Sequence, residues 1–247
     1  MFIQPVLSQT LEELSNTVAY LTKGSQSGTG FFIGNSDNCY LVTAAHVSKF
    51  MDEGSAVKIR IENDKSFSIP ISGIVKGNGI PKWHENEKQD VAILNIDVSY
   101  FIEKFKHRML PLSRFEQKLV APKRERHLVV MGFPLSLGAS GFFSPLTAES
   151  NSASGLLTIK SENGFNQTVF VIDKPSIEGY SGSPVFLMPW PFSDSAAITM
   201  LSVGSEEAKV KCVGIMVSTL SDSTGGKLGA IIPSYYIVEL INEIESK

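Results

Sequence analysis

The chain has 247 residues, of which 43% are hydrophobic and 19% charged, and its formal net charge is −3. This is the balance of a globular protein with enough apolar material for a core, and the charge offers no general attraction to nucleic acid. No apolar run approaches the roughly 18 residues that a membrane-spanning helix needs, and the first residues lack the pattern of a secretory signal. We therefore expect a cytoplasmic protein with no nucleic-acid or membrane partner.

Most segments are short, rich in β-branched and aromatic residues, and separated by Gly, Ser, Asn and Pro. This pattern is typical of barrels or sandwiches. A short helix is predicted after Thr10, where Thr10 to Glu13 resembles a capping box. Strands of the first half are predicted at residues 29–33, 40–43, 57–61, 67–74 and 91–96. Strands of the second half are predicted at residues 128–131, 155–159, 168–172, 184–187, 213–218 and 229–232.

The last residues predict a helix. Ser234 can cap it, and its apolar residues share one face, namely Ile237, Leu240, Ile241 and Ile244. We expect that face to pack on the second half of the chain. The polar, proline-containing segment 106–123 is predicted to connect the two halves.

Metal and cofactor chemistry finds little support in the sequence. Cys39 and Cys212 lie far apart and lack metal-type spacing, so we expect free, buried thiols. The four histidines are dispersed, with no His-x-x-x-His pair, and no phosphate-cradling glycine loop is present. The expectation is a protein without a metal or another cofactor.

Three motifs point to nucleophilic catalysis. Thr43-Ala44-Ala45-His46 comes first, Asp90 then opens the apolar run Val91 to Leu94, and Gly179-Tyr180-Ser181-Gly182-Ser183-Pro184 comes last. A serine hydroxyl needs a base to take its proton, an imidazole suits that task, and a carboxylate can orient the imidazole. His46, Asp90 and Ser181 are the predicted base, orienting acid and nucleophile. Alone, they could be a core histidine, a strand-end cap and a glycine turn; their joint order and spacing favour catalysis.

The order of the three residues excludes two other serine-hydrolase folds. In α/β-hydrolases the histidine follows the serine, whereas all four histidines here precede Ser181, and position 183 is not glycine. Subtilisin-like enzymes need an aspartate before the histidine and a parallel α/β framework, and no such alternation is visible.

These motifs resemble those of the chymotrypsin-like (trypsin-like, PA clan) serine proteases. The closest motif style is that of bacterial HtrA-type protease domains, here without a PDZ domain. His46 and Asp90 are 44 residues apart, and Asp90 and Ser181 are 91 apart, as in that family. Further matching motifs lie at residues 129–134, 213–215 and 229–233, and the resemblance covers roughly residues 18–244.

The resemblance implies an all-β fold of two six-stranded antiparallel β-barrels with a C-terminal α-helix. The single peptidase unit, 1–247, would comprise a first barrel (17–105), a crossover (106–123), a second barrel (124–233) and a helix (234–247). His46 and Asp90 would come from the first barrel and Ser181 from the second. The amides of Gly179 and Ser181 would form the oxyanion hole of a serine endopeptidase that works through an acyl-enzyme.

Substrate preference is predicted from the same resemblance. The pocket floor would lie at Pro175, with Ser176 beside it, and since neither is acidic we expect a small or apolar P1 residue rather than Lys or Arg. Val217, Ser218 and Thr219 would form a pocket wall and pair with the backbone of a protein or peptide substrate.

The segment Met188 to Lys211 leaves two interpretations open. It is longer than a hairpin needs and contains Trp190 and Phe192. It is either a lid or docking loop for an activating partner, since exposed aromatics favour recognition, or an extra hairpin over the barrel. The alternative function is accordingly a non-catalytic or partner-activated trypsin-fold module that binds peptides.

Overall fold

The computed structural model describes residues 11–34, 37–75, 79–97, 108–161, 163–189 and 210–246. The strands of the first half are β1 (Val18–Lys23), β2 (Gln26–Gly34), β3 (Cys39–Thr43), β4 (Ala56–Arg60), β5 (Ser66–Pro70), β6 (Trp83–Asn86) and β7 (Val91–Ile96). They form one antiparallel sheet in the order β5-β4-β1-β2-β3-β7-β6.

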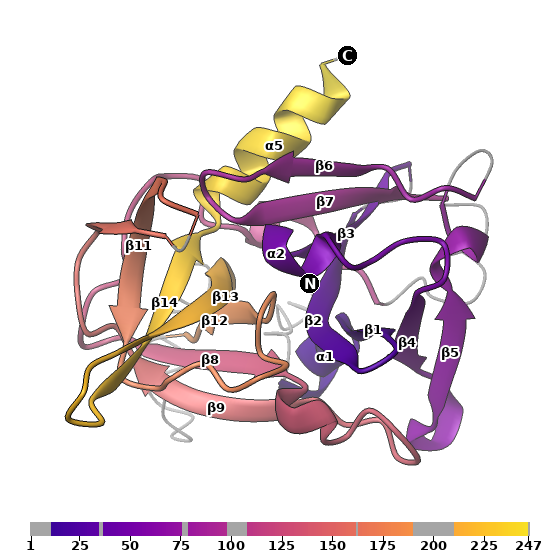
Figure 1. Ribbon diagram of the computed structural model, residues 1–247, viewed down its shortest axis with the longest axis horizontal. Coiled ribbons are helices and arrows are strands. Elements are labelled where there is room, and N and C mark those ends of the chain that lie inside the picture. The colour runs from indigo at the N-terminus through magenta and orange to yellow at the C-terminus, as the bar shows by residue number, and fades with distance from the viewer. Residues whose placement is uncertain are drawn as a thin grey trace, which may run out of the picture.

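The second half forms a separate sheet, which lies beside the first in Figure 1. Its strands are β8 (His127–Gly132), β9 (Leu146–Asn151), β10 (Leu157–Lys160), β11 (Asn166–Ile172), β12 (Pro184–Leu187), β13 (Lys211–Ser221) and β14 (Lys227–Pro233). The order is β10-β11-β14-β13-β12-β8-β9, again antiparallel. The predicted all-β class is confirmed.

Helices occupy a small part of the described chain. They are α1 (Leu11–Ser15), α2 (Ala45–Ser48) and α5 (Tyr235–Glu245). Short 3-10 turns lie at Glu62–Asp64, Ile71–Gly73, Leu112–Arg114 and Pro134–Ser136. The short N-terminal helix is where the sequence placed it, although Thr10 of the predicted capping box lies outside the described residues.

Each sheet has seven strands, one more than the six predicted for each barrel. The strands absent from the prediction are β1, β6 and β9. β6 and β9 are polar, and they belong to their sheets through backbone pairing with β7 and β8. Hydrophobic periodicity detects a strand by its buried face, so a polar strand at the edge of a sheet escapes it.

The two halves share part of one hydrophobic core. β3 is buried along its whole length, and the four residues that follow Asp90 are buried as well. One continuous cluster of apolar side chains contains residues of both sheets and of α5. The two halves therefore share part of their hydrophobic core, and its burial stabilises their contact. Cys39 and Cys212 are buried thiols that form no disulfide, as predicted.

The final helix packs differently from the prediction. Its apolar face contains the predicted residues, but α5 contacts β6 and β7 of the first sheet as well as β14 of the second. Near its end Tyr40 donates a hydrogen bond to Glu245 Oε1 at 3.0 Å. The prediction that the helix packs on the second half was incomplete, because the helix crosses to the first half.

Ser234 lies at the N-cap position of α5, as predicted, but it does not cap the helix with its side chain. The Ser234 side chain makes no capping hydrogen bond. Its hydroxyl instead donates to the carbonyl oxygen of Glu116 at 2.7 Å. A capping hydroxyl accepts from an amide of the first turn, and the capping residue usually has an extended backbone. Ser234 instead has helical backbone angles, with φ −62° and ψ −18°.

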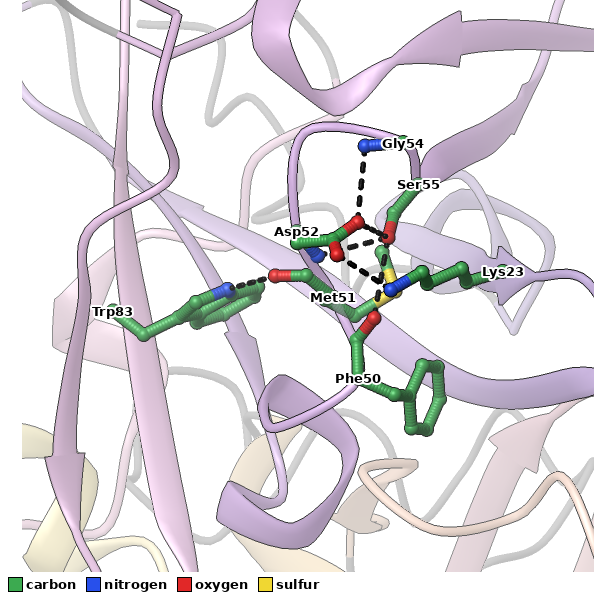
Figure 2. A network of polar contacts seen from close by, with 7 residues as sticks. All are labelled: Lys23, Phe50, Met51, Asp52, Gly54, Ser55 and Trp83. Carbon is green, nitrogen blue, oxygen red and sulfur yellow. Dashed lines mark hydrogen bonds and ion pairs between the residues drawn. The ribbon is translucent and has the colours of Figure 1, made fainter.

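Figure 2 shows how the loop that follows α2 is held. Asp52 accepts hydrogen bonds from Lys23 Nζ at 2.5 Å and from Gly54 N at 3.0 Å. The bond with Lys23 is the main cause that lowers the pKa of Asp52. Trp83 Nε1 donates to the carbonyl oxygen of Met51 at 3.0 Å. These contacts tie the loop to β1 and β6, and so restrain the exit from α2.

The predictions for the segment Met188 to Lys211 and for the absence of a membrane span concern what the structure describes. Residues 190–209, most of the segment Met188 to Lys211, lie outside the described residues, so both interpretations of that segment stay open. Within the described residues, no helix has the length and apolar character needed to cross a membrane.

Candidate active site

His46 and Asp90 form a two-point contact within the first half. His46 lies in α2, directly after β3, and Asp90 directly precedes β7. The His46 ring donates from Nδ1 to Asp90 Oδ2 at 2.8 Å, and the His46 backbone N donates to Asp90 Oδ1 at 2.9 Å. Both carboxylate oxygens are thus used, and the ring orientation is fixed relative to its own backbone.

The backbone at Asp90 is unusual. Its φ is +52°, in the left-handed region that few residues other than glycine adopt. Aspartate tolerates that region better than most side chains. The carbonyl oxygen of Asp90 accepts a hydrogen bond from Ala45 N at 3.1 Å. Backbone and side chain of Asp90 together bind the first turn of α2.

This contact determines which nitrogen of the His46 ring is free. A carboxylate can only accept a hydrogen bond, so Nδ1 carries the hydrogen. In the neutral ring Nε2 then has the lone pair and can accept a proton. The His46 side chain is 43% exposed, whereas that of Asp90 is 16% exposed. The His46 ring is therefore open to solvent, while the Asp90 carboxylate that holds it is largely covered.

Ser181 follows a tight turn. Tyr180 N donates to the carbonyl oxygen of Ile177 at 2.8 Å, and Gly179 has a φ of +95°. This combination defines a type II turn, which favours glycine at its third position. A Cβ added to Gly179 would also lie 2.3 Å from the carbonyl oxygen of Phe133. Glycine is required here by conformation and by space.

The peptide between Glu178 and Gly179 has a defined orientation. Its carbonyl oxygen accepts a hydrogen bond from Leu135 N at 2.7 Å. Because a trans peptide points its C=O and N–H in opposite directions, the Gly179 N–H points away from Leu135. Within the described residues, neither Gly179 N nor Ser181 N donates a hydrogen bond. Both amides are available to an oxygen atom of a ligand.

The turn of Ser181 packs against the residues that lead to His46. Gly182 has a φ of +86°, and a Cβ added to it would lie 2.3 Å from Thr43 Oγ1 and 3.1 Å from Ala44 N. Thr43 ends β3, and Ala44 precedes α2. The structure thus brings the turn with Ser181, from the second half, against the segment with His46, from the first.

The hydroxyl of Ser181 points to a different partner. It donates to the carbonyl oxygen of Val217 at 3.4 Å, a long hydrogen bond. Among the described residues, no hydrogen bond joins it to His46. The pairing of β13 with β14 is irregular between Met216 and Ser218, which makes Val217 the extra residue of a bulge. Bulges of this kind redirect backbone groups near functional sites.

The predicted substrate residues come together beside this turn. Thr219 Oγ1 donates to the carbonyl oxygen of Ser176 at 2.6 Å. Pro175, Ser176, Ser218 and Thr219 are half-buried, and Val217 is buried. The predicted pocket floor and pocket wall are therefore joined by a direct hydrogen bond.

Sequence reasoning missed two polar residues at the junction of the halves. Thr29 of β2 makes hydrogen bonds to Gly179 and Ser181; its setting between two glycines was the available signal. Gln89 Oε1 accepts a hydrogen bond from Thr168 N of β11 at 3.0 Å. No sequence pattern indicates the contact of Gln89, because its partner lies in the other sheet.

Two further properties bear on chemistry. Among the residues that the structure describes, no group of three or more His, Cys, Asp or Glu side chains could hold a metal ion. Tyr180, beside the candidate nucleophile, is 5% exposed. Burial raises the pKa of its phenol, which keeps the side chain uncharged.

Solved structures share this fold over most of their length. The protease domain of MamO from Magnetospirillum magneticum, in its apo form, has a TM-score of 0.61 and 16% identity, covering 93% of this chain and 98% of that chain. For the Rv3671c protease of M. tuberculosis in its inactive form, the TM-score is 0.56 at 15% identity, with 95% and 91% covered. For Deg5 it is 0.57 at 15% identity, with 92% and 88% covered. The predicted chymotrypsin-like fold of two β domains is confirmed.

Sequence comparison identifies the family. No curated protein matches the chain. A family model described as the trypsin-like peptidase domain matches residues 28–189, which is more than half of the chain. The protein therefore belongs to the trypsin-like peptidase domain family.

Proposed function

We propose that the protein is a serine endopeptidase that cleaves peptide bonds through an acyl-enzyme. Ser181 is the nucleophile, His46 the general base and Asp90 the residue that orients the base. The amides of Gly179 and Ser181 stabilise the negative charge that develops on the substrate carbonyl oxygen. Membership in the trypsin-like peptidase domain family supports a protein or peptide substrate.

The observation that carries the proposal is the contact of His46 with Asp90. The bond of 2.8 Å from Nδ1 to Oδ2 leaves Nε2 as the proton acceptor. The packing of Gly182 on Thr43 and Ala44 supports the approach of Ser181. Proton transfer then needs rotation of the Ser181 side chain from Val217 toward Nε2, a change between staggered rotamers.

Substrate preference follows from the predicted pocket. Thr219 Oγ1 donates a hydrogen bond to the carbonyl oxygen of Ser176 at 2.6 Å, and neither Pro175 nor Ser176 is charged. A small P1 side chain such as alanine fits this lining better than lysine or arginine, whose charges would be desolvated without a partner.

The test is labelling with a fluorophosphonate probe, which reacts with an activated serine. The wild-type protein should be labelled, and Ser181→Ala and His46→Ala should each abolish labelling without lowering the melting temperature by more than a few degrees. His84→Ala is the matched control, because His84 is half-buried in β6 and outside the site. Full labelling of Ser181→Ala would disprove the assignment of the nucleophile.

A second candidate function rests on the hydroxyl of Ser181, which bonds to Val217 and not to His46. This state suits a trypsin-fold peptide-binding module that is non-catalytic, or that becomes active when a partner rotates the serine. Such a protein would bind a peptide but resist the probe. An activating partner that docks through the segment Met188 to Lys211 would restore labelling, and this outcome separates triggered from constitutive activity.

A further inference from the structure

Thr29 uses all of its polar backbone and side-chain atoms at the junction of the two halves. It is fully buried in β2. Its N–H donates to the carbonyl oxygen of Ser181 at 2.9 Å, and its hydroxyl donates to the carbonyl oxygen of Gly179 at 2.7 Å. The hydroxyl also accepts from Phe133 N at 3.1 Å, and the Thr29 carbonyl accepts from Thr43 Oγ1 at 2.7 Å.

We propose that Thr29 is a positioning residue. It holds the segment Gly179–Ser181 so that the backbone amides of Gly179 and Ser181 point at the substrate. The inference rests on the proposed function, since it gives those amides their purpose. Thr29 touches no substrate itself. It acts by fixing two carbonyl groups of the turn, one through its side chain and one through its backbone.

The peptide planes of the turn explain why these two contacts matter. The plane of Gly179 and Tyr180 is fixed by the Thr29 hydroxyl on its C=O and by Ile177 on its N–H. The plane of Ser181 and Gly182 is fixed by Thr29 N on its C=O. Each plane held by Thr29 is therefore next to a plane that carries a free amide. A planar peptide transmits that restraint, because only φ and ψ connect neighbouring planes.

The hydroxyl group performs two roles that few side chains can combine. It donates to Gly179 O and accepts from Phe133 N. Phe133 leads into the turn whose Leu135 N holds the carbonyl of Glu178. Loss of the hydroxyl would release Gly179 O and leave two buried polar groups unsatisfied. Serine can fill both roles, whereas valine, which has nearly the same shape, can fill neither.

The contacts also connect the turn to the base. Thr43 ends the strand before α2, and its hydroxyl binds Thr29 O. A continuous path of hydrogen bonds therefore runs from Thr43 through Thr29 to Gly179. The half of the molecule that carries His46 thereby also restrains the turn that carries Ser181.

The experiment compares Thr29→Val with Thr29→Ser. The first readout is hydrogen exchange of residues 177–183, measured by mass spectrometry in a Ser181→Ala background that needs no activity. We expect Thr29→Val to raise exchange there by about tenfold, because buried hydrogen bonds are lost, and Thr29→Ser to leave it near the original value. Thr22→Val is the matched control, since it removes a single exposed hydrogen bond to Gln26 in the neighbouring strand.

The second readout is turnover of a peptide p-nitroanilide with alanine at P1. Thr29→Val should lower kcat by about a hundredfold, as expected for misplaced oxyanion donors, with KM and the pH profile of kcat little changed. Thr29→Ser should restore kcat. A merely structural role would lower the amount of folded protein and leave the kcat of the folded fraction intact.

The outcomes separate the two proposals. Unchanged exchange at 177–183 in Thr29→Val overturns the role of Thr29, whatever the activity. Failure of the wild-type protein to react with probe or peptide defeats the proposed function, while the exchange measurement still decides on Thr29. If Thr29→Val does not fold, Thr29→Cys takes its place, because a thiol is a weak donor; wild-type exchange and kcat in that variant overturn the proposal.

Discussion

Gly182→Ala should disturb the junction of the two halves more than any comparable change in an exposed loop. Gly182 has a φ of +86°, and a Cβ on it would lie 2.1 Å from the carbonyl oxygen of Thr29 and 2.3 Å from Thr43 Oγ1. These atoms belong to β2 and β3 of the first sheet, whereas Gly182 belongs to the turn before β12. The added methyl group therefore pushes the two halves apart at the site.

The chain provides a control that separates backbone strain from collision. Gly225 has a φ of +94°, and a Cβ on it would meet nothing within 4 Å. Gly225→Ala should cost only the strain of a positive φ, about 1–2 kcal/mol. Gly182→Ala should add the cost of overpacking, about 1–3 kcal/mol. At about 2–4 °C per kcal/mol for a chain of this size, the melting temperature should fall by roughly 2–8 °C in the control and roughly 4–20 °C in Gly182→Ala.

The two variants should also differ in chemistry. Calorimetry gives the melting temperatures, and the rate of fluorophosphonate labelling reports the approach of Ser181 to His46. A displacement of about 1 Å can lower a rate by about a hundredfold, so Gly182→Ala should be labelled far more slowly, while Gly225→Ala should react at the wild-type rate. Equal melting temperatures and equal labelling rates would refute the close packing of the turn on the first sheet.

Three further outcomes are expected. Asp90→Asn should keep the fold, because asparagine tolerates a positive φ, and circular dichroism checks this. The same variant should lower kcat by about 10⁴-fold, as in the known serine-protease triad, and should slow probe labelling. Thr219→Gly should remove the contact with Ser176 and raise kcat/KM for phenylalanine over alanine at P1 by about tenfold, with probe labelling unchanged. Burial raises the pKa of Cys212 from 9.0 to about 12, so this thiol should resist thiol reagents in the native protein. Because the unfolded thiol ionises first, its contribution to stability is complete below about pH 9 and is lost as the pH rises toward 12; urea unfolding of Cys212→Ala should show a smaller decline over that range.

The predictions that succeeded depend on local patterns. β3 and β7 are almost entirely apolar, so the sequence places them well. The two cysteines were predicted to be buried thiols outside any disulfide, and they are. The motifs with His46 and Asp90 were recognisable because each directly adjoins a strongly apolar strand. The structure adds the bond between their side chains.

The predictions that failed depend on contacts between distant parts of the chain. Ser234 has the sequence setting of a helix cap, yet its hydroxyl makes no capping bond and donates to the carbonyl oxygen of Glu116 instead. No local rule predicts that contact, because Glu116 is far away in the sequence. β6 and β9 are strands because neighbouring strands offer them backbone partners, not because their own side chains are apolar. Local propensity is overridden wherever tertiary contacts supply a competing partner.

The same reasoning explains why the sequence points to His46, Asp90 and Ser181 as candidate catalytic residues but not to the residues that support them. A catalytic group needs a particular side chain, so it leaves a mark in the sequence. Its support needs only a donor or an acceptor at the right place, and threonine or glutamine can supply that anywhere in the chain. Thr29 and Gln89 each connect the two sheets. Thr29 binds the carbonyl oxygen of Gly179 directly, and Gln89 directly precedes Asp90 in the chain. The geometry of the candidate site is therefore a property of the junction between the halves. If the proposed function holds, changes at Thr29 or Gln89 should alter activity without altering His46, Asp90 or Ser181.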